Sequence, residues 1–265
     1  MSEAIVTIAT KGNFYSQFAP LFEYSAKRLG FQAKVFYLED EFPELQLKDA
    51  NAARFLLPMD KLPWDYVYFT DVDFVFLNKQ LLEYHKNIIG KTRMPYSGHR
   101  GPRGGQALNE RPFKKWDGKY SRIAAGAFMA TREWLKATTT IRKRWLDKVR
   151  GGWIRYRESD EIMLQRICVE AQMKTPEEVG CFVGGATYDI NMRDLHLGDF
   201  KFKRWRDIAK MRGKFLTDHN LKKYEALTED PHFCALRDMA CVNPDIGGLF
   251  KHLQTHIYRR HQCLK

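Results

Sequence analysis

The sequence lacks several features that would each mark a class of protein. No apolar stretch approaches the roughly 18 residues of a membrane-spanning helix, and no repeat or low-complexity tract is visible. The first ten residues lack the basic segment and cleavage site of a signal peptide, so we expect a β-strand there. The five cysteines are an odd number without a CxxC pair, which favours free thiols in a reducing compartment. We expect a cytoplasmic protein, with the inner membrane surface and the cytoplasm of a phage-infected host as settings that fit.

The chain does contain enough apolar material for a core, together with a large excess of positive charge. Hydrophobic residues make up 44% of the 265 residues, charged residues make up 29%, and the mean hydropathy is -0.50. This length allows one large α/β domain or two small ones. The net charge of +12 predicts an anionic partner surface, namely a membrane, a nucleic acid or a phosphate-bearing substrate.

The first 40 residues show the pattern of a βαβ unit. Residues 4–9 form a short apolar, β-rich run, which predicts a buried parallel strand. A turn at 11–13 leads into a predicted helix over 14–29, which Gly30 closes. Residues 33–38 predict the second strand. This order of elements is typical of an α/β protein.

Two carboxylates follow the third predicted strand. Residues 49–56 indicate a short helix, and residues 64–70 are nearly all apolar or aromatic, as in a strand buried on both faces. That strand runs directly into Asp71-Val72-Asp73, and a short strand over 74–77 follows. In open α/β sheets, ligands bind at the carboxyl ends of the strands. We therefore expect Asp71 and Asp73 to lie at a binding edge.

The second half alternates between basic segments and regular elements. Residues 91–122 are rich in Gly, Pro and basic side chains, which predicts a long mobile loop over a site. Further expected elements are a strand at 123–129, a basic helix at 132–148, a helix at 160–171 capped by Ser159, a loop at 184–188, a basic aromatic stretch at 201–214 and a basic amphipathic helix at 248–265.

The acidic triplet is suited to binding a metal if the backbone turns between its carboxylates. On an extended strand Asp71 and Asp73 would point to opposite faces, and a turn at the strand end would bring both to one cation. Mg²⁺ and Mn²⁺ prefer one or two carboxylates together with phosphate oxygens and water. Such a metal neutralises a leaving diphosphate as a Lewis acid and template.

Four blocks of sequence follow one another along the chain: residues 52–73, which include Arg54 and the D-x-D triplet, residues 124–129 around Gly126, residues 159–164, and residues 194–198 followed by Lys201 and Trp205. In this order they resemble the GT-A glycosyltransferases, especially the retaining family typified by bacterial lipooligosaccharide galactosyltransferases and glycogenin. The resemblance covers roughly residues 4–205. It implies one GT-A, Rossmann-like α/β domain with a mostly parallel central sheet in residues 1–205. A basic helical extension would follow in residues 206–265.

The resemblance also implies roles for individual residues. Asp71 and Asp73 would bind Mn²⁺ or Mg²⁺ with His196, whose imidazole suits Mn²⁺ better. The other implied positions bind the nucleotide diphosphate-sugar: Ala9, Thr10 and Asn13 at the base, Arg54 at the nucleotide-sugar or Asp71, Gly126 in its strand, Asp160 at the sugar hydroxyls, Glu161 near the anomeric carbon and Lys201 at the diphosphate.

The chain departs from the pattern of this family at several points. Ala124 replaces an asparagine, the spacing from His196 to Lys201 is one residue shorter, and no proline precedes Trp205. Glu161 stands where the family has glutamine, and a carboxylate there can serve as nucleophile or base. Retention of the anomeric configuration is thus implied by the resemblance alone.

These observations predict a metal-dependent glycosyltransferase, a hexosyl- or pentosyltransferase, that uses a UDP-sugar. Basic stretches with interleaved aromatics, among them Trp145, suit an anionic acceptor. Two acceptors fit this charge: hydroxymethylated pyrimidine in phage DNA, and a membrane-surface glycan or lipid-linked saccharide. For the second, the C-terminal helix could lie on anionic lipid through Phe250, Leu253, Ile257 and Tyr258.

Two other functions stay open at this point. The carboxylates Asp71 and Asp73 would also suit a metal-dependent phosphoesterase or nuclease, which needs no sugar donor. A nucleic-acid-binding protein could instead use a C-terminal zinc module built from Cys234, Cys241, His252 and His256. The oligomeric state is not predicted.

Overall fold

The computed structural model describes residues 1–100, 123–152, 160–174, 182–183, 195–196 and 218–262. The chain divides into two compact units that both draw on separate stretches of sequence. The first contains Met1–Lys11, Gln32–Asp71 and Gln80–Gly184, and the second contains Gly12–Phe31, Val72–Lys79 and Gly185–Lys265. The predicted boundary at residue 205 lies outside the described residues and stays a prediction.

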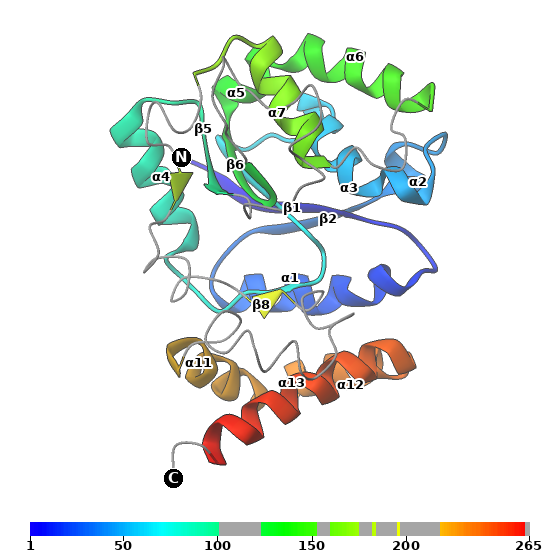
Figure 1. Ribbon diagram of the computed structural model, residues 1–265, viewed down its shortest axis with the longest axis vertical. Helices are drawn as coiled ribbons and strands as arrows, with labels where there is room; N and C mark the ends of the chain where they lie inside the picture. Colours follow the sequence, from blue (N-terminus) through cyan, green and yellow to red (C-terminus); the bar gives the residue numbers. More distant parts are fainter. Residues whose placement is uncertain (101–122, 153–159, 175–181, 184–194, 197–217, 263–265) are drawn as a thin grey trace, which may run out of the picture. The chain divides into compact units, whose positions relative to one another are not determined.

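The first unit is built on a six-stranded sheet (Figure 1). Its strands, in spatial order, are β2 (Ala33–Tyr37), β1 (Glu3–Ala9), β3 (Tyr66–Thr70), β6 (Ile123–Thr131), β5 (Tyr96–Arg100) and β7 (Phe182–Val183). The pairs β1–β2, β1–β3 and β5–β7 are parallel, whereas β6 is antiparallel to both β3 and β5. Five strands therefore run the same way, which confirms the predicted α/β class with a mostly parallel sheet.

Helices of the first unit cover one face of this sheet. They are α2 (Leu38–Glu41), α3 (Ala50–Ala53), α5 (Arg132–Ala137), α6 (Thr139–Arg150) and α7 (Asp160–Glu170), with short 3-10 helices η2 (Leu47–Asp49), η3 (Arg54–Leu56) and η4 (Met59–Lys61). Figure 1 shows α3, α5, α6 and α7 on the same side of the strands. The core between them includes Val6, Phe55, Phe69, Phe128 and Trp134, all buried. The alternating inward residues of β1 and β3 supply its sheet side.

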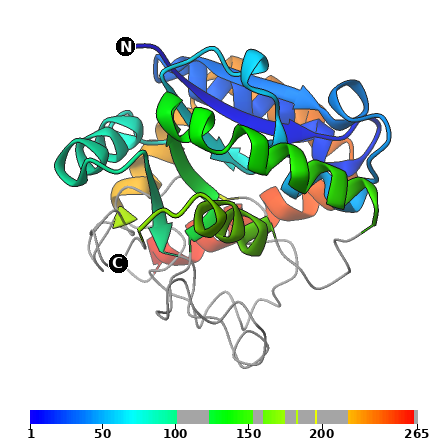
Figure 2. The same ribbon diagram turned by 90° about the horizontal axis from the view of Figure 1, so that it is seen from above.

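At the end of the sheet formed by β5 and β7, the helix α4 (Leu81–Thr92) contacts both strands. Both views show this helix, coloured teal, beside β5 and remote from β2 (Figure 1, Figure 2). Neither α4 nor β5 was expected from the sequence, which predicted a loop over residues 91–122. That prediction is wrong for 96–100, because Tyr96 and Ser97 are fully buried and pair with β6. Residues 101–122 lie outside the described part of the chain.

The basic helix predicted over 132–148 is divided in two at Thr138. The Thr138 hydroxyl donates to the carbonyl of Trp134 at 2.7 Å, and the Thr139 hydroxyl donates to that of Leu135 at the same distance. Threonine hydroxyls that bond to earlier carbonyls compete with the helical ladder and bend helices. Residue 138 has φ −98 and ψ 0, outside the helical region. The helical run is therefore interrupted at Thr138, between α5 and α6.

The second unit contains η1 (Phe14–Phe18), α1 (Ala19–Arg28), the strand pair β4 (Phe74–Val75) and β8 (Leu195–His196), and the helices α11 (Asp218–Thr228), α12 (Pro231–Cys241) and α13 (Pro244–Gln262). The predicted helix over 14–29 thus begins as a 3-10 turn, and Gly30 ends it with φ +85. Phe22 and Phe76 pack edge to face at 5.2 Å, and the Tyr24 hydroxyl donates to Asp230 at 2.5 Å. These contacts join α1 to β4 and α12.

The C-terminal helix does not present the apolar face that binding to lipid would require. In α13 the side chains of Phe250, Leu253 and Ile257 are buried, and only Tyr258 of the predicted four is exposed. The apolar stripe packs inward because α12 and α13 contact each other. The expectation that this stripe lies on a membrane is therefore wrong. Among the described residues, no helix combines the length and apolar character needed to cross a bilayer.

Gly98 of β5 lies where β5 and β6 approach closely, and it provides a test of the sheet. A Cβ at this position would lie 2.6 Å from Cγ2 of Ile123 and 3.6 Å from Cδ2 of Phe128. A β-branched side chain cannot rotate away easily, so Gly98→Ala overpacks the pair. We expect a loss of about 1–3 kcal/mol in the free energy of unfolding. Urea denaturation measures it, and Gly90→Ala, where nothing lies within 4 Å of the added Cβ, is the control. Equal stability of the two variants would contradict the β5–β6 register.

Candidate functional site

The acidic triplet lies where β3 ends, at the carboxyl edge of the parallel strands. Tyr66–Thr70 form the strand, and residues 72 and 73 form a turn before β4. The backbone turn that metal binding requires is therefore present. Thr70 donates its hydroxyl to the carbonyl of Gly126 at 2.7 Å and so fixes the end of β3 against β6. This edge is where ligands bind in open α/β sheets.

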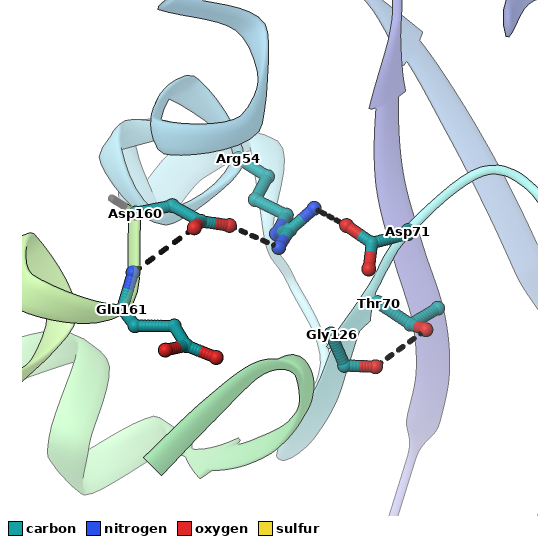
Figure 3. A network of polar contacts seen from close by, with 6 residues as sticks. All are labelled: Arg54, Thr70, Asp71, Gly126, Asp160 and Glu161. Carbon is teal, nitrogen blue, oxygen red and sulfur yellow. Dashed lines mark hydrogen bonds and ion pairs between the residues drawn. The ribbon is translucent and has the colours of Figure 1, made fainter. Parts of the chain in front are cut away.

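Arg54 is the centre of the site in the first unit. Its side chain is only 2% exposed, and its guanidinium is ion-paired with both Asp71 and Asp160. One nitrogen, Nη1, donates to Oδ1 of Asp71, and Nη2 donates to Oδ2 of Asp160 at 2.7 Å. Figure 3 shows the guanidinium between the two carboxylates. A guanidinium has donors arranged in a fixed fork, so it holds both carboxylates in defined positions.

The two carboxylates at the start of α7 have different environments. Asp160 also accepts from the backbone N–H of Glu161 at 3.0 Å, which satisfies one unpaired donor of the helix N-terminus. Glu161 extends beside it, and in Figure 3 its carboxylate lies on the side that faces Gly126 of β6. Its side chain is half-buried. Asp160 is thus held by Arg54 and the helix, while Glu161 is directed elsewhere.

Burial raises the pKa of Asp160, the negative charge of Asp71 raises it further, and the charge of Arg54 opposes both effects. The Asp160 side chain is 15% exposed. An acid with a raised pKa binds its proton more readily in the folded state than in the unfolded chain. The stability linked to this group therefore falls as the pH rises from the unfolded value toward the folded pKa.

Asp160→Asn is expected to remove this component of the pH dependence. In the wild type, the folded state gains relative stability as the pH falls toward the ordinary aspartate pKa of about 3.9. The amide cannot titrate, so the variant should have a flatter curve of melting temperature against pH above that value. Scans of both proteins between about pH 4 and 7 measure the difference. Parallel curves would show that the Asp160 pKa is not raised.

Three positions predicted to line a nucleotide base lie at or after the end of β1. Ala9 and Thr10, in the first unit, are 2% and 3% exposed. The next backbone N–H, of Lys11, donates to both carboxylate oxygens of Glu39 at 3.0 Å. Asn13, in the second unit, caps η1 by accepting from the N–H groups of Tyr15 and Ser16 at 2.9 and 3.1 Å. Asn13 therefore has a local structural role, and its contact with a base stays a prediction.

The remaining metal ligands of the prediction belong to the second unit. Asp73 is buried, with 5% exposure, just before β4. The strand β8 pairs antiparallel with β4, and in this register the backbone of His196 lies opposite Phe74. The chain thus brings His196 beside the residue that follows Asp73. Lys201 lies outside the described residues.

The predicted C-terminal zinc module can be compared with the described part of the chain. Among the described residues, no three His, Cys, Asp or Glu side chains cluster as a metal site. The Cys234 thiol donates to the carbonyl of Thr228 at 3.0 Å.

Trp145, expected to stack on an acceptor, is fully buried and donates its Nε1–H to Glu170 at 3.0 Å. Its predicted stacking role is therefore wrong, because a buried ring has no free face.

Sequence reasoning singled out Arg54, Asp71 and Asp160 but did not pair Arg54 with Asp160, which is 106 residues away. It also missed Thr70, whose hydroxyl joins β3 to Gly126. A signal for the ion pair was present in the chain. Arg54 lies in an otherwise apolar run and is followed by Phe55, Leu56 and Leu57. An arginine buried in such a run needs carboxylates or carbonyls close by.

Among the solved structures that are similar to this chain are two glycosyltransferases. One is involved in the glycosylation of the major capsid of PBCV-1, with 15% identity over 69% of this chain and 81% of that chain, at a TM-score of 0.43. The other is the galactosyltransferase LgtC, solved with donor and acceptor sugar analogs, with 11% identity over 82% of this chain and 85% of that chain, at a TM-score of 0.42. Neither a scan of protein-family models nor a search of curated proteins found a match.

Proposed function

We propose that the protein is a metal-dependent glycosyltransferase that moves a sugar from a nucleotide diphosphate-sugar, with UDP as the expected nucleotide, to an acceptor hydroxyl. One observation carries the proposal. The buried Arg54 pairs with Asp71, the first carboxylate of the D-x-D triplet, and with Asp160, at the start of α7. Two separate blocks of the family resemblance, residues 52–73 and 159–164, thus supply one contiguous set of charged groups at the carboxyl edge of the sheet.

The chemistry of the predicted ligands fits Mn²⁺ or Mg²⁺. Asp71 and Asp73 supply hard carboxylate oxygens, and His196 supplies an imidazole, which favours Mn²⁺. When bound, the metal would neutralise the diphosphate that leaves with the nucleotide. Asp71 gives one oxygen, Oδ1, to Arg54. Hydrogen bonding of this kind orients a metal-binding carboxylate.

The residues around the ion pair divide the other tasks. Arg54 fixes the position of Asp71 and Asp160 at once, so binding of donor requires little rearrangement of either carboxylate. Asp160 is proposed to accept hydrogen bonds from donor sugar hydroxyls. Glu161, half-buried beside it, is proposed to lie near the anomeric carbon, where a carboxylate can act as nucleophile or as base. Lys201 is proposed to contact the diphosphate as a point charge.

The acceptor is proposed to be anionic, because the chain carries a net charge of +12. Two classes fit this charge: DNA with hydroxymethylated pyrimidines, and a membrane-surface glycan or lipid-linked saccharide. Transfer of radiolabelled sugar to each class, at low and high salt, would separate them, since binding of a polyanion weakens steeply with salt.

A thermal-shift screen of nucleotide diphosphate-sugars with Mn²⁺ tests the donor directly. A ligand that binds only the folded state raises the melting temperature, by an amount set by its concentration relative to Kd. We expect a rise for one nucleotide-sugar that disappears on addition of a chelator. Hydrolysis of phosphodiesters without any sugar donor, together with no shift from any nucleotide-sugar, would favour the phosphoesterase or nuclease instead.

A further inference from the structure

Arg142, on α6, is a buried cation whose hydrogen-bond partners among the described residues are backbone carbonyls and one hydroxyl. Its side chain is 2% exposed, and burial lowers its pKa to about 10. Its Nη1 donates to the carbonyls of Leu57 at 2.5 Å and Phe55 at 3.5 Å. The other two nitrogens donate to residues close to Arg142 in the chain. Nη2 donates to the carbonyl of Leu135 at 3.1 Å, and Nε donates to the Thr138 hydroxyl at 3.2 Å. Every guanidinium nitrogen therefore has a partner.

The two carbonyls that Nη1 of Arg142 contacts, those of Phe55 and Leu57, lie at the end of η3. This 3-10 helix covers Arg54–Leu56, and Leu57 then leaves it with φ −50 and ψ 132. The last carbonyls of a helix have no partner inside it, and Pro58, which follows, has no N–H to help close the turn. Arg142 thus supplies, from another helix, the donors that end η3. Cations are favoured at helix C-termini for the same reason.

Arg54 is the first residue of that same helix. Its side chain extends from η3 to Asp71 and Asp160, and both contacts depend on where the η3 backbone lies. Short 3-10 turns have poor hydrogen-bond geometry, so contacts from other elements contribute to where the η3 backbone lies. We propose that Arg142 is a positioning residue, which holds the η3 backbone so that Arg54 meets both carboxylates. The inference deepens the proposed function, on which it rests for its effect on catalysis.

Arg142→Met and Arg142→Lys test the inference. Methionine removes all donors, so we expect kcat to fall on the order of 10- to 100-fold, as displacement of a positioned group does. Lysine keeps the cation but offers one nitrogen in place of the fork, so it should restore part of kcat. The KM for the acceptor should change little in both variants. Melting temperatures show whether each variant folds. If Arg142→Met does not fold, the kcat of Arg142→Lys tests the inference.

Arg132→Met is the matched control. Arg132 also donates from Nη1 to a carbonyl that ends a 3-10 helix, that of Leu62 after η4, at 2.8 Å. The carbonyl of Leu62 is not part of η3, the helix that begins with Arg54. We expect Arg132→Met to lower the melting temperature while kcat stays within about twofold, as for changes at independent sites. A loss of kcat equal to that of Arg142→Met would overturn the positioning role.

A second readout needs no sugar transfer. In ¹⁵N-arginine-labelled protein, the Nε–H resonance of Arg54, assigned by its loss in Arg54→Lys, reports the surroundings of the guanidinium. We expect it to shift or broaden in Arg142→Lys and to stay unchanged in Arg132→Met. An unchanged resonance in both Arg142 variants would overturn the inference. If the wild type transfers no sugar but the resonance still depends on Arg142, the proposed function fails and the positioning role stands.

Discussion

Asp71→Asn is expected to abolish most sugar transfer while the protein stays folded. The amide has nearly the shape of the carboxylate but no charge, so it loses both metal affinity and the ionic part of its bond to Arg54. Removal of one preorganised electrostatic group typically lowers kcat on the order of 100- to 1,000-fold. We therefore expect a loss at least of this size, measured as initial rates of transfer with saturating Mn²⁺ and donor. Far-UV circular dichroism should match that of the wild type.

Asp65→Asn provides the matched control for this change. Asp65 precedes β3, at the opposite end of the strand from Asp71, and accepts from the backbone N–H of Ser2 at 2.8 Å. That bond lowers the pKa of Asp65, so the residue is ionised at neutral pH. Its replacement also removes one negative charge, beside the other end of β3, and transfer should continue. Undiminished transfer by Asp71→Asn would refute the D-x-D assignment.

Arg54→Met is expected to destabilise the fold and to eliminate transfer together. Removal of one partner from a buried ion pair typically costs about 3–5 kcal/mol, because it leaves an uncompensated charge. Here two carboxylates lose their shared cation, although Asp71, 28% exposed, retains some solvent, which favours the lower end of that range. Equilibrium denaturation should give a loss of about 3 kcal/mol in the free energy of unfolding.

A double variant separates the two effects of Arg54. Replacing a buried ionic group together with its partner by neutral groups is often close to neutral for stability. Arg54→Met combined with Asp160→Asn should therefore recover much of the stability, while transfer stays low because Asp71 is still without its guanidinium. Recovery of transfer along with stability would mean that Arg54 acts only on the fold.

The first three strands and α1 were predictable because their signals are local. In β1 and β3 every position but the first is buried, so their apolar runs mark them directly, and Gly30 ends α1 by its positive φ. The strand β5 was not predicted because its sequence, YSGHR, contains a glycine and polar residues. Its partner β6 also begins more than 20 residues later in the chain. The strand β6 was predicted from its own residues, but its pairing with β5 left no signal in the sequence of β5.

The C-terminal helices show the same limit. On α12 only Phe233 and Ala240 are buried, seven residues apart, which is too sparse to mark an amphipathic helix. On α13 the apolar stripe was recognised, but its neighbour was not known, so a membrane was assigned where another helix lies. At the site, residue types identified Arg54, Asp71 and Asp160 singly. The fold alone shows that Arg54 contacts both, because α7 and β3 are remote in the chain.

The reversed strand β6 has a consequence for how such a protein can change. Because β6 runs against its neighbours, the pair β5–β6 meets at Arg100 and Ile123, beyond the level at which Thr70 pairs with Ala127. Arg100 and Ile123 are therefore strand ends that the sheet holds at the edge that carries Asp71. The free-energy cost of closing a connection depends only weakly on its length once its ends are fixed. Changes of length between Arg100 and Ile123 should therefore leave the ion pairs of Arg54 with Asp71 and Asp160 in place.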